Sequence, residues 1–89
     1  MPKVRIPPPY RGPTHGTAEL IVEDGDVRAC LVATEQKFPG FLPQVLDAEG
    51  RVHRFVKLFK NGKQLQGEAL REPLAADDDL EIIAAIAGG

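Results

Sequence analysis

One long segment, from Asp26 to Phe38, spaces its apolar residues at helical intervals in this 89-residue chain. Residues at steps of three, four and seven share one face of a helix. That face holds Val27, Cys30, Leu31, Thr34 and Phe38. Asp26 can cap the first turn, Lys37 lies near the negative end of the helix dipole, and Pro39-Gly40 ends the helix. A single amphipathic helix has to bury its face against a sheet.

The rest of the chain supplies short strands in which apolar residues alternate with polar ones. We expect strands at residues 3–7, 17–23, 54–60, 63–66 and 80–86. The Asn61-Gly62 pair indicates a tight hairpin turn between two of them. A short helical turn is expected at residues 44–46, and Leu70 and Leu74 are expected to anchor an irregular segment to the core. The order predicts an α+β fold: a mixed sheet of four to five strands packed on one main helix.

The composition indicates one small globular domain without a disulfide framework, because the chain holds a single Cys. The net charge of −2, with Lys and Arg spread along the chain, disfavours nucleic-acid binding, which needs a clustered basic face. No apolar run approaches the roughly 18 residues that span a bilayer. The start of the sequence also lacks the apolar core of a signal peptide. We therefore expect a cytoplasmic protein that contacts neither membrane nor nucleic acid.

Candidate catalytic side chains are few. His15 and His53 have no Cys or carboxylate at metal-ligand spacing, so no metal site is expected. Cys30 falls on the apolar helix face, which favours a buried structural thiol over a reactive one. Asp77, Asp78 and Asp79 are adjacent, whereas calcium loops space their ligands, so a solvated turn is expected. We predict that this chain is not an enzyme and binds no cofactor.

The sequence ends with "AAIAGG", an apolar strand followed by two glycines at positions 88 and 89. A C-terminal carboxylate becomes an electrophile when a partner enzyme activates it with ATP. Glycine suits a tail that has to enter a narrow channel, because it permits backbone approaches that side chains prevent. A frayed end or a cloning remnant is the alternative interpretation of the glycine pair alone.

Several motifs together resemble the MoaD/ThiS family of sulfur carriers, and the resemblance covers nearly the whole chain. They are "VRIPPPYR", "DGDV", "KFPG", "VLDAEGRVHRFVKLF" before the Asn61-Gly62 turn, "PLAADDDLEII" and the terminal "AAIAGG". Two features depart from the family pattern: many relatives have a proline where this chain has Ala84 or Ala85, and a "DGD" turn where it has three aspartates. The resemblance implies a ubiquitin-like β-grasp fold, with a domain at residues 1–86 and a flexible reactive tail at residues 87–89.

The resemblance also implies a mechanism. The carboxylate of Gly89 attacks ATP on an adenylating partner enzyme, and a persulfide or sulfide then displaces AMP to leave a thiocarboxylate. Ala87 and Gly88 thread the tail into the partner. The sulfur is passed to an acceptor enzyme, and ATP is used by the partner only.

Four destinations for the tail chemistry stay open. The "GRVHRFV" stretch and the proline-rich first loop look most like the cysteine-biosynthesis branch, in which a cysteine synthase-like enzyme accepts the sulfur and a metalloprotease cuts the product from the tail. The alternatives are the small subunit of molybdopterin synthase, a thiamine sulfur carrier, and a ubiquitin-like modifier that tags lysines.

Strand alternation also predicts a partner-binding surface. Val56, Leu58, Leu80 and Ile82 are expected to face the helix. The predicted partner-binding residues are Phe55, Phe59, Ile83, Ala85 and Ile86. Exposed apolar groups that cluster together mark interaction sites, although scattered apolar surface residues are also normal. Arg54, Lys57 and Lys60 are expected either to steer a partner or to be simply solvated.

Overall fold

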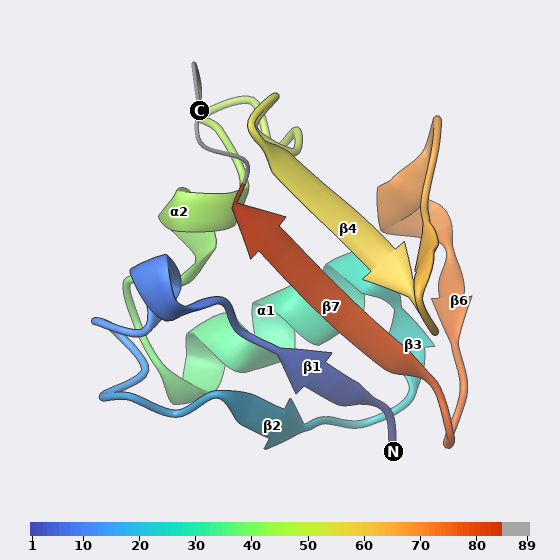
Figure 1. The fold of residues 1–89 in the computed structure, drawn as a ribbon, viewed down its shortest axis with the longest axis horizontal. Coiled ribbons are helices and arrows are strands. Elements are labelled where there is room, and N and C mark those ends of the chain that lie inside the picture. Colours follow the sequence, from blue (N-terminus) through green and yellow to red (C-terminus); the bar gives the residue numbers. More distant parts are fainter. Residues whose placement is uncertain (85–89) are drawn as a thin grey trace.

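The alternating segments form one five-stranded sheet, in the order β2-β1-β7-β4-β5 (Figure 1). The computed structural model describes residues 1–84. The strands of this sheet are β1 (Lys3–Arg5), β2 (Glu19–Ile21), β4 (Val56–Lys60), β5 (Lys63–Gln64) and β7 (Asp79–Ala84).

The central strand of the sheet is β7. It pairs in parallel with β1, from Lys3↔Asp79 to Arg5↔Glu81. On its other side it pairs antiparallel with β4, from Val56↔Ala84 to Lys60↔Leu80. β2 and β5 lie at the edges, each antiparallel to its neighbour. The sheet is therefore mixed, and the last described strand runs through its middle.

The helix predicted from the spacing of apolar residues is α1 (Val27–Lys37), which lies across one face of the sheet (Figure 1). Asp26 caps it as expected, because its Oδ1 accepts a hydrogen bond from the Ala29 N–H at 2.7 Å. Phe38 follows the last turn and is half-buried. Among residues 1–84, no helix is long and apolar enough to cross a membrane.

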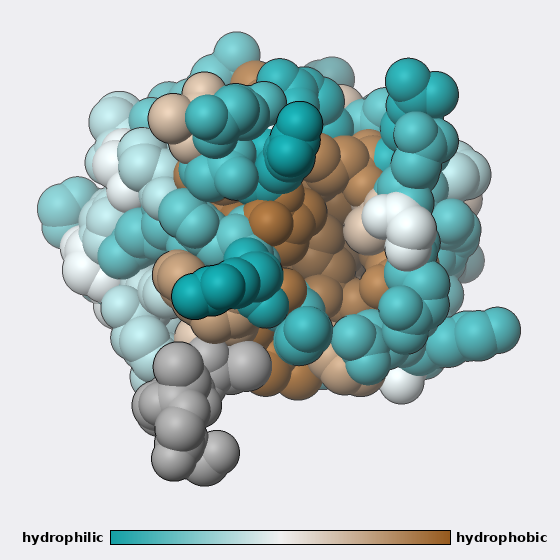
Figure 2. Space-filling view, turned by 90° about the horizontal axis from the view of Figure 1, so that it is seen from above, coloured by the Kyte–Doolittle hydropathy of each residue, from teal (hydrophilic) through white to brown (hydrophobic). Residues whose placement is uncertain are grey.

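The core lies between α1 and the sheet. It contains the four strand residues that were predicted to face the helix, Val56, Leu58, Leu80 and Ile82, each at most 4% exposed. Leu74 is also buried, and Leu70 packs against the core, so both predicted anchors are confirmed. Viewed from above, the molecule shows an apolar hollow where this core is incompletely covered (Figure 2).

Several elements are shorter than the sequence indicated. The first strand ends at Arg5, before the prolines, although the Ile6 N–H still donates to the Ala18 carbonyl at 2.8 Å. The second strand spans only Glu19–Ile21. The strand predicted from residue 54 begins at Val56, because a turn closed by the Val56 N–H on the His53 carbonyl precedes it. The predicted strand 80–86 is observed from Asp79 to Ala84, and its remainder lies outside the described residues.

The structure also contains elements that the sequence analysis missed. A second, two-stranded sheet pairs β3 (Gly25–Asp26) with β6 (Pro73–Leu74) just before the helix. Two short 3-10 helices, η1 (Pro8–Tyr10) and η2 (Ala69–Arg71), were also not predicted. The short helix α2 (Leu42–Val45) begins two residues earlier than expected, with Pro43 in its first turn.

Candidate partner-docking site

The face of the sheet opposite α1, called the open face below, is built by the alternation of four strands. Residues that pair across a sheet point to the same side of it. Pairing therefore places on this face Lys3, Arg5, Glu19, Ile21, Lys57, Phe59, Asp79, Glu81 and Ile83.

Two predicted partner-binding residues, Phe59 and Ile83, are diagonal neighbours on the open face. Ile83 lies opposite Lys57, and Phe59 lies opposite Glu81. Diagonal neighbours are within reach of aromatic side chains. Ile83 is 37% exposed, and Phe59 is half-buried. They form a small apolar contact surface within a largely charged face.

Phe55 lies in the turn before β4, so strand alternation does not fix its direction as the sequence analysis assumed. Its ring stacks on His53, with centroids 5.0 Å apart and an angle of 12° between the planes. The side chain is 42% exposed. Phe55 is thus available to a partner, held in place by His53 rather than by the sheet.

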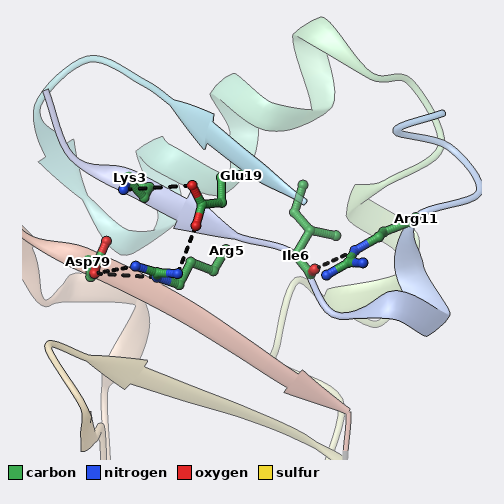
Figure 3. Close-up of polar contacts among 6 residues, drawn as sticks. All are labelled: Lys3, Arg5, Ile6, Arg11, Glu19 and Asp79. Atoms are coloured by element: carbon green, nitrogen blue, oxygen red, sulfur yellow. Dashed lines mark hydrogen bonds and ion pairs between the residues drawn. The ribbon is translucent and has the colours of Figure 1, made fainter. Parts of the chain in front are cut away.

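A charged network that the sequence analysis missed crosses three strands of the open face (Figure 3). Arg5 lies between Glu19, at 2.8 Å, and Asp79, at 3.2 Å. Lys3 adds a longer contact to Glu19 at 3.7 Å. The hydrogen bond to Asp79 and the charges of both carboxylates raise the pKa of Arg5. The opposite charges at Lys3, Arg5 and Glu19, on alternate positions of two pairing strands, are the signal that could have revealed the network.

A shallow groove of about 390 Å³ lies beside the end of β7. One wall comes from β7 itself, residues Glu81 to Ala84, and the other from the proline-rich loop after β1. Arg11 closes this loop, because its Nε donates to the Ile6 carbonyl at 3.0 Å (Figure 3). The groove thus offers apolar surface bordered by charges of both signs, at the point where the chain continues to residue 85; these charged residues are Arg5, Arg11, Glu19 and Glu81.

The three cations considered for steering differ in their surroundings. Lys60 is half-buried, and its Nζ lies 3.0 Å from Glu72 and 3.8 Å from Asp78. The hydrogen bond to Glu72 is the main cause of its raised pKa. Lys60 is therefore paired with carboxylates of its own chain rather than simply solvated, whereas Arg54 and Lys57 are exposed.

The aspartate run was expected to be a solvated turn, and this is wrong for two of its three residues. Asp78 accepts from the Ala75 N–H at 2.8 Å and from Asn61 Nδ2 at 2.9 Å. These hydrogen bonds lower the pKa of Asp78. Asp79 pairs with Arg5, and of the three aspartates only Asp77 is classed as exposed. The turn is therefore joined to the β4–β5 hairpin.

Cys30 is fully buried, as its place on the helix face predicted. Burial, followed by the nearby charges of Asp26 and Asp24, raises the pKa of its thiol. Within residues 1–84, no three His, Cys, Asp or Glu side chains are grouped so as to hold a metal ion. His15 contacts the Phe38 ring edge-on, with 6.4 Å between the centroids.

The remaining predicted site residues fall outside the described part of the chain. These are the reactive Gly89, the threading residues Ala87 and Gly88, and the contact residues Ala85 and Ile86. Their predicted roles stay predictions. The described part of the chain ends at Ala84, the last residue of the central strand β7.

Solved structures with this fold are small proteins of similar length. Mycobacterium tuberculosis CysO, described as an antigen, has a TM-score of 0.88 and 24% identity over 97% of this chain and 100% of its own. A chain of the Amycolatopsis orientalis BexX/CysO complex has a TM-score of 0.90 and 24% identity, with all of both chains covered. SAMP1 from Haloferax volcanii has a TM-score of 0.78 and 21% identity over 99% of this chain and 98% of its own.

These likenesses define the class of fold to which the chain belongs. Neither the protein-family models nor the curated protein sequences gave a match. The mixed sheet on one main helix is the ubiquitin-like β-grasp fold, shared with CysO and SAMP1. The fold that the resemblance to MoaD/ThiS sulfur carriers implied is therefore confirmed.

Proposed function

We propose that this protein is a ubiquitin-like sulfur carrier whose reactive group is the carboxylate of Gly89. The observation that carries the proposal is the position of β7. The central strand of a CysO-like sheet leads into "AIAGG", so the domain can hold the chain rigidly up to Ala84 while a partner enzyme handles the residues beyond. The proposal takes Gly89 as the carboxyl terminus of the working protein.

The chemistry requires two displacements on the partner enzyme. A carboxylate oxygen of Gly89 attacks the α-phosphorus of ATP, and pyrophosphate leaves as the acyl-adenylate forms. Hydrosulfide then attacks the carbonyl carbon, the C–O bond to AMP breaks, and a thiocarboxylate remains with release of one proton. The carrier contributes no catalytic group, and the partner binds the ATP.

The open face is the proposed docking surface for the adenylating enzyme. Exposed apolar residues within a charged rim are typical of partner contacts. Ile83 and Phe59 supply the apolar contact, and Arg5 and Arg11 flank the groove beside the end of β7. The chain from the Amycolatopsis structure comes from a BexX/CysO complex, which supports a protein partner for this fold.

Cysteine biosynthesis is the proposed destination of the sulfur. The fold likeness to CysO supports it, together with the "GRVHRFV" stretch and the proline-rich loop. In this scheme a cysteine synthase-like enzyme accepts the sulfur and a metalloprotease then cuts the cysteine from the tail. A purified thiocarboxylate offered in parallel to cysteine synthase-like, molybdopterin-forming and thiamine-forming acceptors would identify the branch by which acceptor regenerates the carboxylate.

Intact-mass measurement tests the carrier function directly. Incubation with an adenylating partner, ATP and sulfide should raise the mass of the chain by about 16 Da, because one oxygen is replaced by sulfur in the activated acyl group. A variant that lacks Gly89 is the matched control and should keep its mass and its fold. An unchanged mass with every adenylating partner tried would overturn the proposal.

A ubiquitin-like protein modifier is the second candidate. The likeness to SAMP1, whose name is small archaeal modifier protein 1, favours it. A modifier would join Gly89 to lysine side chains through isopeptide bonds, which tryptic peptide sequencing of cell extracts detects. Conjugates without any thiocarboxylate would select this function over sulfur carriage.

A further inference from the structure

A second groove, larger than the one beside β7, lies on another side of the molecule. It has a volume of about 770 Å³ and is lined by residues 50–54, 56–58 and 64–71. In Figure 2 it is the apolar hollow bordered by hydrophilic side chains. We call it the β4–η2 groove.

The groove exists because β5 covers only one end of β4. β5 pairs with Phe59 and Lys60, and the Leu65 N–H donates to the Leu58 carbonyl at 2.8 Å. The chain then turns away at Gly67, whose φ of 60° lies in the left-handed region, and η2 packs on α1. β4, by contrast, pairs with β7 from Val56 onward. The first half of β4 is therefore left with an open space beside it.

The floor of the groove is apolar and continuous with the core. Val56 and Leu58 are buried beneath it. Around them, Val52, Leu65 and Leu70 are half-buried and pack against the core while keeping part of their surface exposed. An apolar hollow with a polar rim is typical of a protein interaction site.

The rim of the groove is positive. Four of its lining residues are cations, Arg51, Arg54, Lys57 and Arg71, and one is a carboxylate, Glu68. Glu68 already lies 3.6 Å from Arg71. Within residues 1–84, none of the other three cations forms an ion pair. This rim contrasts with the net charge of −2 of the whole chain.

One wall of the groove is held rigid by a local turn. Asp47 Oδ1 accepts from the Glu49 and Arg51 N–H groups, at 2.9 and 3.0 Å. The hydrogen bond from Arg51 is the main cause of the lowered pKa of Asp47. A bridge between Leu46 and Val52 closes the same loop. A preformed wall reduces the ordering cost of binding.

We propose that the β4–η2 groove binds a peptide segment of a partner protein that presents apolar side chains between carboxylates. The apolar side chains would fill the floor, and the carboxylates would meet Arg51, Arg54 and Arg71 on the rim. Charge complementarity of this kind steers association and fixes the partner's identity.

A peptide fits the groove better than a small molecule does. Small-molecule sites combine enclosure with a few precisely placed polar groups inside the cavity. The cations here are exposed and stand on opposite walls. Among the described residues, the buried side-chain polar atoms without a partner are Tyr10 Oη and Gln44 Oε1, and neither residue lines the groove.

The groove is separate from the docking site assigned to the adenylating enzyme. Of the open-face residues, only Lys57 and none of the apolar ones also line the β4–η2 groove. The inference therefore goes beyond the proposed function, and its test uses neither ATP nor sulfur.

An NMR titration of the full ¹⁵N-labelled chain tests the proposal. The probe is an acetylated, amidated seven-residue peptide in which four Glu alternate with three Leu. Saturable shifts should be confined to residues 50–58 and 64–71, with a dissociation constant at or below about 1 mM. Two matched peptides, one with Gln for Glu and one with Ser for Leu, should each bind at least about tenfold more weakly. Absence of saturation, or shifts on the open face instead, would overturn the proposal.

Charge reversal on the rim provides the second measurement. The Arg51→Glu/Arg54→Glu variant should bind the acidic peptide about tenfold more weakly than the wild type does. Each exposed charge pair contributes modestly, and charge reversal adds repulsion. Lys37→Glu/Lys63→Glu is the control with the same change in net charge, since both are exposed cations outside the groove lining. It should bind the peptide within about twofold of the wild type. Equal weakening in both variants would mean that the peptide senses only net charge, and the groove proposal would then be wrong.

Discussion

The side chain of Asp26 stabilises the start of the main helix. Asp26 serves two elements, because its backbone belongs to β3 and its side chain caps α1. Replacing an N-cap Asp with Ala typically costs about 1 kcal/mol. We expect Asp26→Ala to lower the free energy of unfolding by about this amount in urea denaturation.

Asp77→Ala is the matched control for this cap. Asp77 is an exposed aspartate for which the described structure gives no hydrogen bond or ion pair. Its removal should change stability by less than about 0.5 kcal/mol. A loss at Asp77 as large as that at Asp26 would contradict the capping role.

Cys30 leads to a prediction about labelling. The thiol is fully buried, and burial raises its pKa, so little reactive thiolate exists in the folded protein. Iodoacetamide should leave Cys30 unmodified in the native chain and alkylate it once in urea, as read by peptide mass spectrometry. Under native conditions an exposed thiocarboxylate should then be the only site labelled. Rapid native labelling of Cys30 would show that α1 opens readily.

Among the elements, the β4–β5 hairpin depends on a two-residue turn in the left-handed region. Asn61 has a φ of 53° and Gly62 a φ of 83°. A residue with a Cβ pays roughly 1–2 kcal/mol in this conformation. Gly62→Ala should therefore lower the free energy of unfolding by about 1 kcal/mol.

Gly12→Ala isolates the backbone effect. A Cβ added at Gly12 or at Gly62 meets no atom within 4 Å. Of these two glycines, Gly62 alone has a positive φ. Thermal and urea denaturation should show Gly12→Ala within about 0.5 kcal/mol of the wild type. An equal loss at both positions would show that the left-handed φ of Gly62 is not its cause.

The turn before β7 makes the stability of the fold depend on pH through the carboxylate of Asp78. Hydrogen bonds from the Ala75 N–H and Asn61, together with the charge of Lys60, lower the pKa of Asp78 below its ordinary value of 3.8. A lowered folded-state pKa contributes stability that is present above the ordinary value and is lost as the pH falls through the folded value. Asp78→Asn should therefore be less stable at neutral pH and show a weaker loss of stability below about pH 4.

The measurement is urea denaturation of the wild type, Asp78→Asn and the control Asp77→Asn at several pH values between about 2 and 7. Asp77→Asn should follow the wild-type pH profile, because Asp77 is exposed. If Asp78→Asn also follows it, the charge of Asp78 does not support the turn.

The sequence predicted those elements whose signals are local. The cap at Asp26, the helix end and the Asn61-Gly62 turn each depend on residues within one turn of each other, and all are confirmed. The β3–β6 pairing joins Gly25 to Leu74, which are far apart in the sequence. Each strand is only two residues long, so no pattern of alternating apolar residues could reveal it. By contrast, β1 ends just before three consecutive prolines, and the turn at His53 is closed by a local hydrogen bond from the Val56 N–H, so both are local features that strand alternation alone did not reveal.

At the scale of the whole molecule, strand alternation predicted which residues face the helix but not what surrounds the exposed ones. Phe59 and Ile83 were placed correctly on the open face, whereas Arg5, Glu19 and Asp79 come together from three strands. The β4–η2 groove likewise depends on where β5 stops, which is a property of packing rather than of local sequence.

Asp substitutions at two isoleucines of the open face test whether a partner docks at a particular place on it or responds to any added charge. Ile83 lies on the central strand beside Phe59, and Ile21 lies on the edge strand β2. Both are exposed, at 37% and 52%, so neither substitution to Asp should disturb the core. If the adenylating enzyme docks at the end of β7, Ile83→Asp buries a charge at the contact. Loss of an interface hot spot of about 1–2 kcal/mol lowers the rate constant kcat/KM for thiocarboxylate formation by about tenfold.

Ile21→Asp introduces the same charge on the same face and should leave kcat/KM within about twofold, because rim residues contribute little. The measurement is the initial rate of thiocarboxylate formation by intact mass at low carrier concentration, with the Tm of each variant recorded alongside. Equal losses in the two variants would assign the effect to the charge of the whole face. A loss at Ile21 alone would move the docking site to the β2 edge, away from the strand that leads to Gly89.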